Sequence, residues 1–212
     1  MVNDLGLDIN YQDDQGNSPT HSYARSLPKN SGEYQKIAFI ALQKYGANFN
    51  IANNEGCTPL HIACLQHNLV AIKLLFSDNT VRAMCKDSIN GDTAFHYLLK
   101  NYIPERRCGR ELAEYENELL KIIIDFLESY PLSIFATNDN GKGIIDLAFE
   151  MEVNYKEKWR NIEGRQLPED EEDPFYVAAE CLFEAVLVQL TNHYEETRQN
   201  MFEYFGEYVS MD

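Results

Sequence analysis

Apolar residues recur three and four positions apart in several stretches of the chain, which is the spacing of one face of an α-helix. In one of these stretches, Leu69, Ile72 and Leu75 fall on a single helical face. The final stretch is amphipathic, and the one before it is apolar nearly all round. The stretches that we predict to be helical are 35–45, 59–66, 69–76, 117–130, 175–190 and 192–209. No run of about 18 apolar residues occurs, so the pattern predicts no membrane-spanning helix.

A polar turn that contains glycine precedes an apolar run at four places. Glycine at such a turn supplies a positive φ angle without steric cost. After the second turn, Thr58 is expected to cap the following helix, and Pro59 fits its first position, where no backbone N–H is needed. His67 and Asn68 then predict a break before the next helix, because both residue types tolerate the left-handed region. The predicted unit is therefore one turn followed by two helices.

The same block of turn and helix recurs along the chain. Residues 6–24 (GLDINYQDDQGNSPTHSYA) align without a gap with residues 46–64 (GANFNIANNEGCTPLHIAC). Shorter copies occupy residues 86–99 and 138–150, and the last copy has Asp146 where the others have histidine. The residues of the repeat signature are Gly16, His21, Gly56, Thr58, Pro59, His61, Gly91, Thr93, His96 and Gly141. A recurrence of this kind predicts stacked units that bury a continuous core.

The second copy reads TPLHIA at 58–63, which matches the T-P-L-H-x-A signature of the ankyrin repeat at every fixed position. The chain therefore resembles the ankyrin-repeat family over roughly residues 5–150, with 175–190 as a final inner helix. The resemblance implies an all-α solenoid of about four repeats, with long insertions between helices and a C-terminal capping helix. It also implies that the signature histidine ties each turn to its helix by hydrogen bonds.

The spacing of the turn glycines locates the insertions. Successive turn glycines lie 40, 35 and 50 residues apart, whereas the repeat period of the family is about 33. We expect the extra residues at 26–32, 101–116 and 155–174. Insertions in repeat arrays often lie on the binding face. The predicted domains are a repeat domain at 1–190, with repeats near 6–45, 46–80, 81–130 and 131–190, and a capping helix at 191–212.

The chain is acidic, and the acidity is concentrated in its second half. It has 18 Lys and Arg against 34 Asp and Glu, a formal net charge of −16. Residues 1–100 hold 8 basic and 9 acidic side chains, and residues 101–212 hold 10 and 25. This charge opposes binding to nucleic acid or to an anionic membrane. The acidic half is a solvated surface that keeps the protein soluble, a face for a basic partner, or a calcium site. The acidic run at 169–173 lacks the spaced pattern of an EF-hand calcium loop.

No catalytic or metal-binding motif stands out. The chain lacks H-E-x-x-H, G-x-S-x-G, the P-loop and G-x-G-x-x-G. His61 and Cys64 lie three positions apart, but both fall within the repeat signature. The 5 cysteines are irregularly spaced, which predicts reduced thiols and no zinc site. We predict a non-enzymatic protein without metal or cofactor; the alternative is an enzyme with its active site in the diverged half, residues 101–212.

Two groups of residues are candidates for binding a partner. By the resemblance, residues at the turn tips project where ankyrin proteins contact their partners. In the insertions, three arginines form a basic cluster and Trp159 is the only tryptophan. The alternative is that the arginines neutralise nearby glutamates and that Trp159 packs its own insertion onto the protein. The predicted partner-binding residues are Asn17, Glu55, Asp92, Arg106, Arg107, Arg110, Lys142 and Trp159.

These predictions combine into a protein-protein interaction module. We expect a monomeric, cytoplasmic adaptor or inhibitor that binds another protein, one with a basic surface, through turn tips, inner helices and insertions. A narrower hypothesis is a bacterial effector, because short arrays with degenerate repeats and large insertions resemble the ankyrin proteins that intracellular bacteria deliver into the host cytosol. An exposed apolar face on 192–209 would instead favour a dimer.

Overall fold

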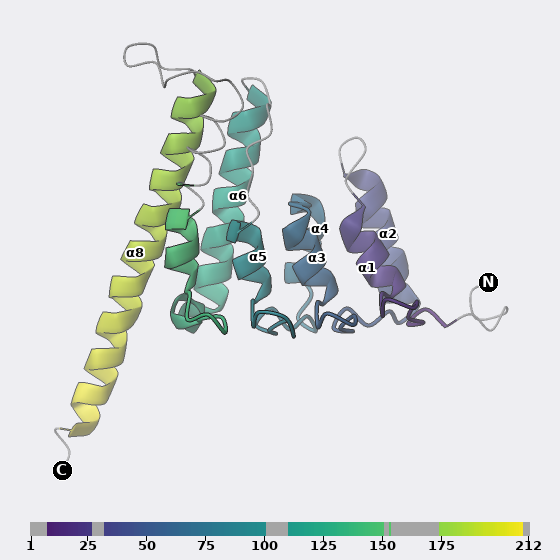
Figure 1. Cartoon of the computed structure of the whole chain (residues 1–212), viewed down its shortest axis with the longest axis horizontal. Coiled ribbons are helices and arrows are strands. Elements are labelled where there is room, and N and C mark those ends of the chain that lie inside the picture. The colour runs from purple at the N-terminus through teal and green to yellow at the C-terminus, as the bar shows by residue number, and fades with distance from the viewer. Residues whose placement is uncertain (1–7, 27–31, 101–109, 151–152, 154–173, 210–212) are drawn as a thin grey trace. The chain divides into compact units, whose positions relative to one another are not determined.

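The computed structural model describes residues 8–26, 32–100, 110–150, 153 and 174–209 (Figure 1). Its helices include α1 (Pro19–Arg25), α2 (Glu33–Lys44), α3 (Pro59–Leu65), α4 (Leu69–Phe76), α5 (Ala94–Lys100), α6 (Arg110–Ser129), the 3-10 helix η2 (Pro131–Phe135) and α8 (Pro174–Val209). A further helix covers residues 144–150. The described residues form helices and turns without a β-strand, which confirms the predicted all-α fold.

The chain divides into two compact units. Unit 1 comprises Met1–Asn101 together with Thr137–Gly141, and unit 2 comprises Tyr102–Ala136 together with Lys142–Asp212. The chain thus leaves unit 1 after α5, within its third repeat, and returns briefly to supply the fourth turn. The boundary between the units differs from the division at residue 190 that the sequence analysis placed before its capping helix.

Unit 1 contains two helix pairs, α1–α2 and α3–α4, followed by α5. α3 packs against α1 and against α5, and α2 packs against α4. The turns that precede the short helices lie along one edge of this unit (Figure 1). Unit 1 therefore repeats the predicted order of turn, short helix and second helix.

The break between α3 and α4 lies at the predicted residues. His67 has a φ of 49°, in the left-handed region. Asn68 then caps α4, because its side chain accepts a hydrogen bond from the N–H of Ala71 (3.2 Å). The Asn68 amide also donates to the carbonyl of Ala24 (3.1 Å). One side chain therefore starts a helix and ties its repeat to the repeat before it. Gly46, with a φ of 75°, follows α2 as the predicted C-terminal glycine.

The core of unit 1 lies between the stacked helices. The ring of Phe39 contacts two other aromatic rings, Tyr23 at 5.9 Å and Phe49 at 5.0 Å between centroids. The largest apolar side chains that are fully buried in this unit are Leu60, Leu75, Phe95, Leu98 and Leu99. Because each helix buries its apolar face only against its neighbours, adjacent repeats stabilise one another.

Unit 2 is built on α6, which buries a helical stripe of apolar side chains. They are Leu119, Ile122, Ile123, Phe126 and Leu127. α8 packs against α6 and against η2. The ring centroids of Phe135 and Tyr194 lie 5.2 Å apart, and the His193 Nε2 lies 3.3 Å from the Pro131 carbonyl oxygen. The C-terminal helix therefore covers one side of α6 within unit 2.

α6 begins earlier than the sequence predicted. It starts at Arg110, seven residues before the helix expected at 117–130, so the end of the predicted insertion at 101–116 is helical. It stops at Ser129, because the chain reaches Pro131, which cannot continue the hydrogen-bonded ladder. Pro131 instead opens the short helix η2.

α8 is one helix of 36 residues, where the sequence analysis expected separate helices at 175–190 and 192–209. No proline or glycine occurs between Phe175 and Phe205 to end it. Thr191, at the expected break, donates its hydroxyl to the Leu187 carbonyl and stays within the helix. Across the described ranges, no helix has the length and hydropathy needed to cross a membrane.

Candidate functional site

The short helices of unit 1 begin with the same hydrogen-bonded turn. At α3, the N–H of Thr58 donates to Nδ1 of His61 (3.1 Å), and the Thr58 hydroxyl oxygen lies 2.9 Å from the same nitrogen. The N–H of His61 bonds back to the Thr58 side chain, which completes a capping box. The equivalent pairs are Ser18–His21 and Thr93–His96, with N···Nδ1 distances of 3.1 and 3.3 Å. The signature histidine therefore closes each turn, as the resemblance implied.

Two of these histidines also join neighbouring repeats. Because a backbone N–H can only donate, Nδ1 is the acceptor and Nε2 carries the ring proton. Nε2 of His21 donates to the carbonyl of Cys57 (2.9 Å), and Nε2 of His61 donates to the carbonyl of Asp92 (3.3 Å). Burial is the main cause that lowers the pKa of both rings, so both are neutral. A neutral imidazole can use one nitrogen for its own turn and the other for the next repeat.

In unit 2 the fourth copy has Asp146 at the histidine position. The N–H of Gly143 donates to Oδ2 of Asp146 (2.8 Å), so a carboxylate oxygen takes the place of the ring nitrogen as acceptor. A carboxylate has no N–H to donate. The fourth copy therefore keeps the bond that starts its helix and loses the donor that His21 and His61 direct to a following repeat.

Successive turns of unit 1 are also joined through their backbones. The N–H of Ser88 donates to the carbonyl of Glu55 (2.9 Å). The equivalent bonds are Asn54 to Gln15 (3.0 Å) and Asp139 to Asn90 (2.8 Å). Gly56 has a φ of 78°, and a Cβ at this position would lie 2.5 Å from the backbone nitrogen of Ser88. The turns therefore stack so closely that Gly56 has no room for a side chain.

The third turn is held by the carboxylate of Asp87. Its Oδ1 accepts hydrogen bonds from the N–H groups of Ile89, Asn90 and Gly91, at 2.8, 2.7 and 3.2 Å. Burial opposes ionisation of this carboxyl, but these donors outweigh it and hold its pKa below the usual value. The turn is therefore fixed by an ionised side chain at neutral pH.

Two of the predicted partner-binding residues are buried, which corrects the expectation that they project from the turns. Asn17 is 9% exposed and accepts a hydrogen bond from the Asn53 amide (3.2 Å). Asp92 is 1% exposed, accepts from the Asn138 amide (2.8 Å) and pairs with the Lys100 ammonium (3.2 Å). Both residues directly follow a turn glycine, where the chain turns back into the unit. They join one repeat to the next instead of facing a partner.

Other predicted binding residues are exposed or lie outside the described residues. Glu55 is exposed on the second turn, and Lys142 is exposed in unit 2, where its ammonium pairs with the Glu150 carboxylate. Arg106, Arg107 and Trp159 fall outside the described residues. Arg110 is the first residue of α6, but its side chain is not among those described. That these residues bind a partner stays a prediction.

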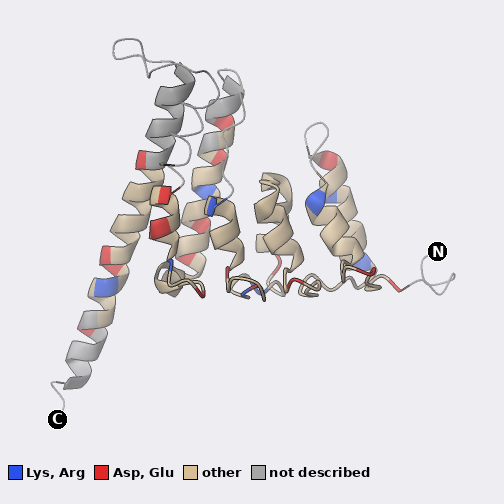
Figure 2. Ribbon diagram, in the orientation of Figure 1, with Lys and Arg blue, Asp and Glu red and all other residues tan. Residues whose placement is uncertain are grey.

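Apart from Glu55, the sequence analysis missed the exposed side chains on the turns of unit 1. We define the turn edge as residues 13–16, 53–56, 87–91 and 138–141. Ile89 is 57% exposed on this edge, and the exposed carboxylates there are Asp13, Asp14, Glu55 and Asp139. Figure 2 shows acidic residues at several of these turns. A sequence signal for Ile89 existed, because the third turn is one residue longer than the second and contains an apolar residue among polar ones.

The buried thiols and histidines do not form a nucleophile–base pair in the described residues. Both ring nitrogens of His61 are used, one for its turn and one for Asp92. Burial raises the pKa of the Cys64 and Cys57 thiols, which keeps them protonated. Cys57, Cys64 and Cys85 are free cysteines. In the part of the chain that the structure describes, no group of three or more His, Cys, Asp and Glu side chains could hold a metal ion.

Known proteins share this pattern over part of the chain. A family model described as ankyrin repeats (3 copies) matches residues 24–119. A putative ankyrin repeat protein of fowlpox virus (strain NVSL) is 43% identical over 65 residues, which is 30% of this chain and 8% of that protein. A probable serine/threonine-protein kinase of Dictyostelium discoideum is 34% identical over 84 residues, which is 40% of this chain and 9% of the kinase. The chain thus spans less than a tenth of the length of either relative.

The matched residues include α2, the α3–α4 pair and α5 of unit 1, together with the capping residues His61 and His96. The sequence signature, the hydrogen-bonded turns and the family model identify the same repeat. Residues 24–119 of this chain are therefore identified as ankyrin repeats.

Proposed function

We propose that the protein is a non-enzymatic interaction module that binds another protein along the turn edge of unit 1. The observation that supports this most directly is the series of backbone bonds between successive turns, which includes Ser88 to Glu55 (2.9 Å) and Asp139 to Asn90 (2.8 Å). A surface that is ordered before binding loses little conformational entropy when a partner docks. Stacked repeats also present extended binding surfaces in general.

The chemistry of the turn edge indicates the kind of partner. Asp14, Glu55 and Asp139 expose carboxylates on three different turns, and Ile89 exposes an apolar side chain among them. Lys86, which directly precedes the third turn, donates to the carbonyl of Thr137 (2.7 Å). We therefore propose a partner with a basic surface and an apolar recess that receives Ile89. Long-range attraction between opposite charges would raise the rate of association.

Affinity capture from a eukaryotic lysate tests this proposal. The bait is the full chain, compared with a Glu55→Lys/Ile89→Asp variant. Leu132→Asp is the matched control, because Leu132 is an exposed apolar residue of η2 in unit 2. We expect a saturable partner that the control retains and the double variant loses. A partner retained equally by all three baits would contradict binding along the turn edge.

A second comparison concerns the insertions. A variant with Arg106, Arg107, Arg110 and Trp159 all changed to alanine tests whether these residues bind the same partner. Loss of the partner in this variant alone would move the binding site to the insertions. Absence of any saturable partner would count against an interaction module, and the diverged half at 101–212 would then be assayed for enzymatic activity.

A narrower proposal is that the protein is an adaptor or inhibitor delivered by a bacterium into the host cytosol. It is supported by the diverged fourth copy with Asp146 and by the long insertions. Parallel capture from bacterial and eukaryotic lysates tests it. We expect a specific partner in the eukaryotic lysate, and a specific partner in the bacterial lysate alone would overturn the effector role.

A further inference from the structure

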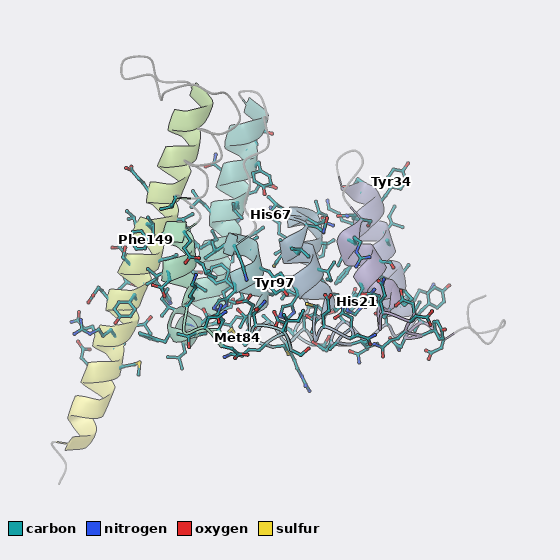
Figure 3. The ribbon with its side chains drawn as sticks, viewed as in Figure 1. His21, Tyr34, His67, Met84, Tyr97 and Phe149 are labelled. Atoms are coloured by element: carbon teal, nitrogen blue, oxygen red, sulfur yellow. The ribbon has the colours of Figure 1, made fainter. Side chains whose placement is uncertain are left out.

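α2 has a second apolar face in addition to the one that it buries. Its core side is formed by Gln35 and Phe39. Ile37 and Ile40, which lie elsewhere on the same helix, are each 61% exposed. Tyr34 and Tyr45 are also exposed, and Tyr34 lies at the start of α2 (Figure 3). A helix face that is exposed to solvent is normally polar, because nothing packs on it.

This second face has an internal symmetry. Glu33, Ile37, Ile40 and Lys44 are spaced by four, three and four residues, which is the spacing of a coiled-coil seam. The order along the seam is acidic, apolar, apolar, basic. An antiparallel copy of the same helix would place Glu33 opposite Lys44 and Ile37 opposite Ile40 at both ends of the contact. The seam is therefore complementary to itself.

We propose that α2 mediates a reversible antiparallel dimer between two copies of this chain. The shared seam makes the contact isologous, which is the commonest symmetry of homodimers. Antiparallel packing also places each helix N-terminus beside the C-terminus of its partner, so the helix dipoles attract. The present pair of Glu33 with Lys36 (3.0 Å) joins two exposed side chains, and such pairs contribute little and exchange readily.

The distribution of charge favours this end of the chain for self-association. Residues 1–100 hold 8 basic and 9 acidic side chains, whereas residues 101–212 hold 10 and 25. Two copies repel each other least where the net charge is near zero. A contact made by one helix of 12 residues from each copy is small, so we expect a dissociation constant on the order of micromolar.

Sedimentation equilibrium over a range of concentrations measures this dimer. Glu33→Lys and Lys44→Glu each place like charges opposite each other at both ends of the contact. We expect each variant alone to dimerise roughly tenfold more weakly than the wild type. An equimolar mixture of the two variants restores opposite charges at both ends and is expected to dimerise as well as the wild type.

Two further variants complete the test. Ile37→Glu buries a charge in the centre of the seam, and we expect it to abolish the dimer. Ile89→Glu is the matched control, because Ile89 is similarly exposed but lies on the turn edge; we expect it to leave the dimer unchanged. A monomeric wild type at all concentrations would overturn the proposal, even if α2 then proved to bind another protein. If the equimolar mixture dimerises no more tightly than either charge variant alone, the antiparallel arrangement is overturned.

Discussion

Unit 1 and the fourth copy in unit 2 use the same local structure to start a helix, but only unit 1 extends it between repeats. In unit 1, His21 and His61 accept a hydrogen bond within the turn and donate another to the neighbouring repeat. In unit 2, Asp146 accepts the equivalent bond and has nothing to donate. The signature residue therefore has two separable roles: it starts the helix of its own repeat, and it joins that repeat to the next one.

The comparison also concerns the packing of the turns. The turn at Gly56 abuts the next turn so closely that no side chain fits, whereas a Cβ on Gly141 would meet no atom within 4 Å. Both glycines have a positive φ angle, of 78° and 74°. Stacking therefore excludes a side chain at Gly56, whereas the turn at Gly141 leaves room for one. We expect a substitution at Gly56 to lower the free energy of unfolding more than one at Gly141.

Substitution of these two glycines should give the largest difference in the free energy of unfolding. Gly56→Ala adds strain in the left-handed region and a clash with the Ser88 backbone, and we expect it to lower the free energy of unfolding by about 3–4 kcal/mol. Gly141→Ala adds only the strain, and we expect about 1 kcal/mol. Urea denaturation followed by circular dichroism measures both. Equal losses would show that the close approach of the turns does not contribute.

Removal of the signature side chain should give the next largest difference. His61→Ala leaves the Thr58 N–H and the Asp92 carbonyl without their buried partner, and we expect a loss of about 3 kcal/mol. Asp146→Ala removes one exposed capping bond, and we expect about 1 kcal/mol. The melting temperatures of the two variants measure this. His61→Asp, which copies the fourth repeat, should not recover wild-type stability, because its carboxylate is buried and cannot bridge.

Acidification should weaken unit 1 through its histidines. The pKa values of His21 and His61 are lowered by burial in the folded state, so the unfolded chain binds more protons. Their contribution to stability is therefore present above the unfolded pKa of about 6.5 and is lost as pH falls below it. We expect the urea midpoint to fall between about pH 7.5 and 5.5. His61→Ala should reduce this pH dependence. If the urea midpoint of the variant changes with pH as steeply as that of the wild type, His61 is not a source of the effect.

The smallest difference in stability is expected between two ion pairs, each formed by a lysine and a carboxylate. Lys100→Ala in unit 1 leaves the buried carboxylate of Asp92 without its cation, and we expect a loss of about 1–2 kcal/mol. Lys142→Ala in unit 2 removes an ion pair between two exposed side chains, and we expect a loss below about 0.5 kcal/mol. Chemical denaturation compares them. A larger effect at Lys142 would show that this residue does more than pair with Glu150.

The part of the fold that the sequence predicted well is the part where a residue acts on its own neighbours. Thr58 and Pro59 start a helix, and His67 ends one, through local backbone preferences that the sequence displays directly. The bounds of α3 and α4 followed from these residues. α8 was divided wrongly, because its apolar pattern changes midway while nothing in its sequence breaks a helix.

The candidate surface was predicted less well, because exposure depends on the neighbouring repeat. Asn17 and Asp92 are polar residues beside a turn, and no sequence pattern indicates that the next repeat covers them. Their partners, Asn53 and Asn138, lie 36 and 46 residues further along the chain. Conversely, Ile37 and Ile40 fit a helix that would be buried on both sides, and the structure leaves one side exposed.

The bonds between successive turns also determine how unit 1 would respond to force. Neighbouring repeats are joined by a backbone bond at the turn edge and, at His21 and His61, by a ring nitrogen. A pull along the stack loads these connections in series, so they carry the same tension and the weakest opens first. The unit would then extend in steps of one repeat at low force, as a compliant element that lengthens without losing all of its structure at once.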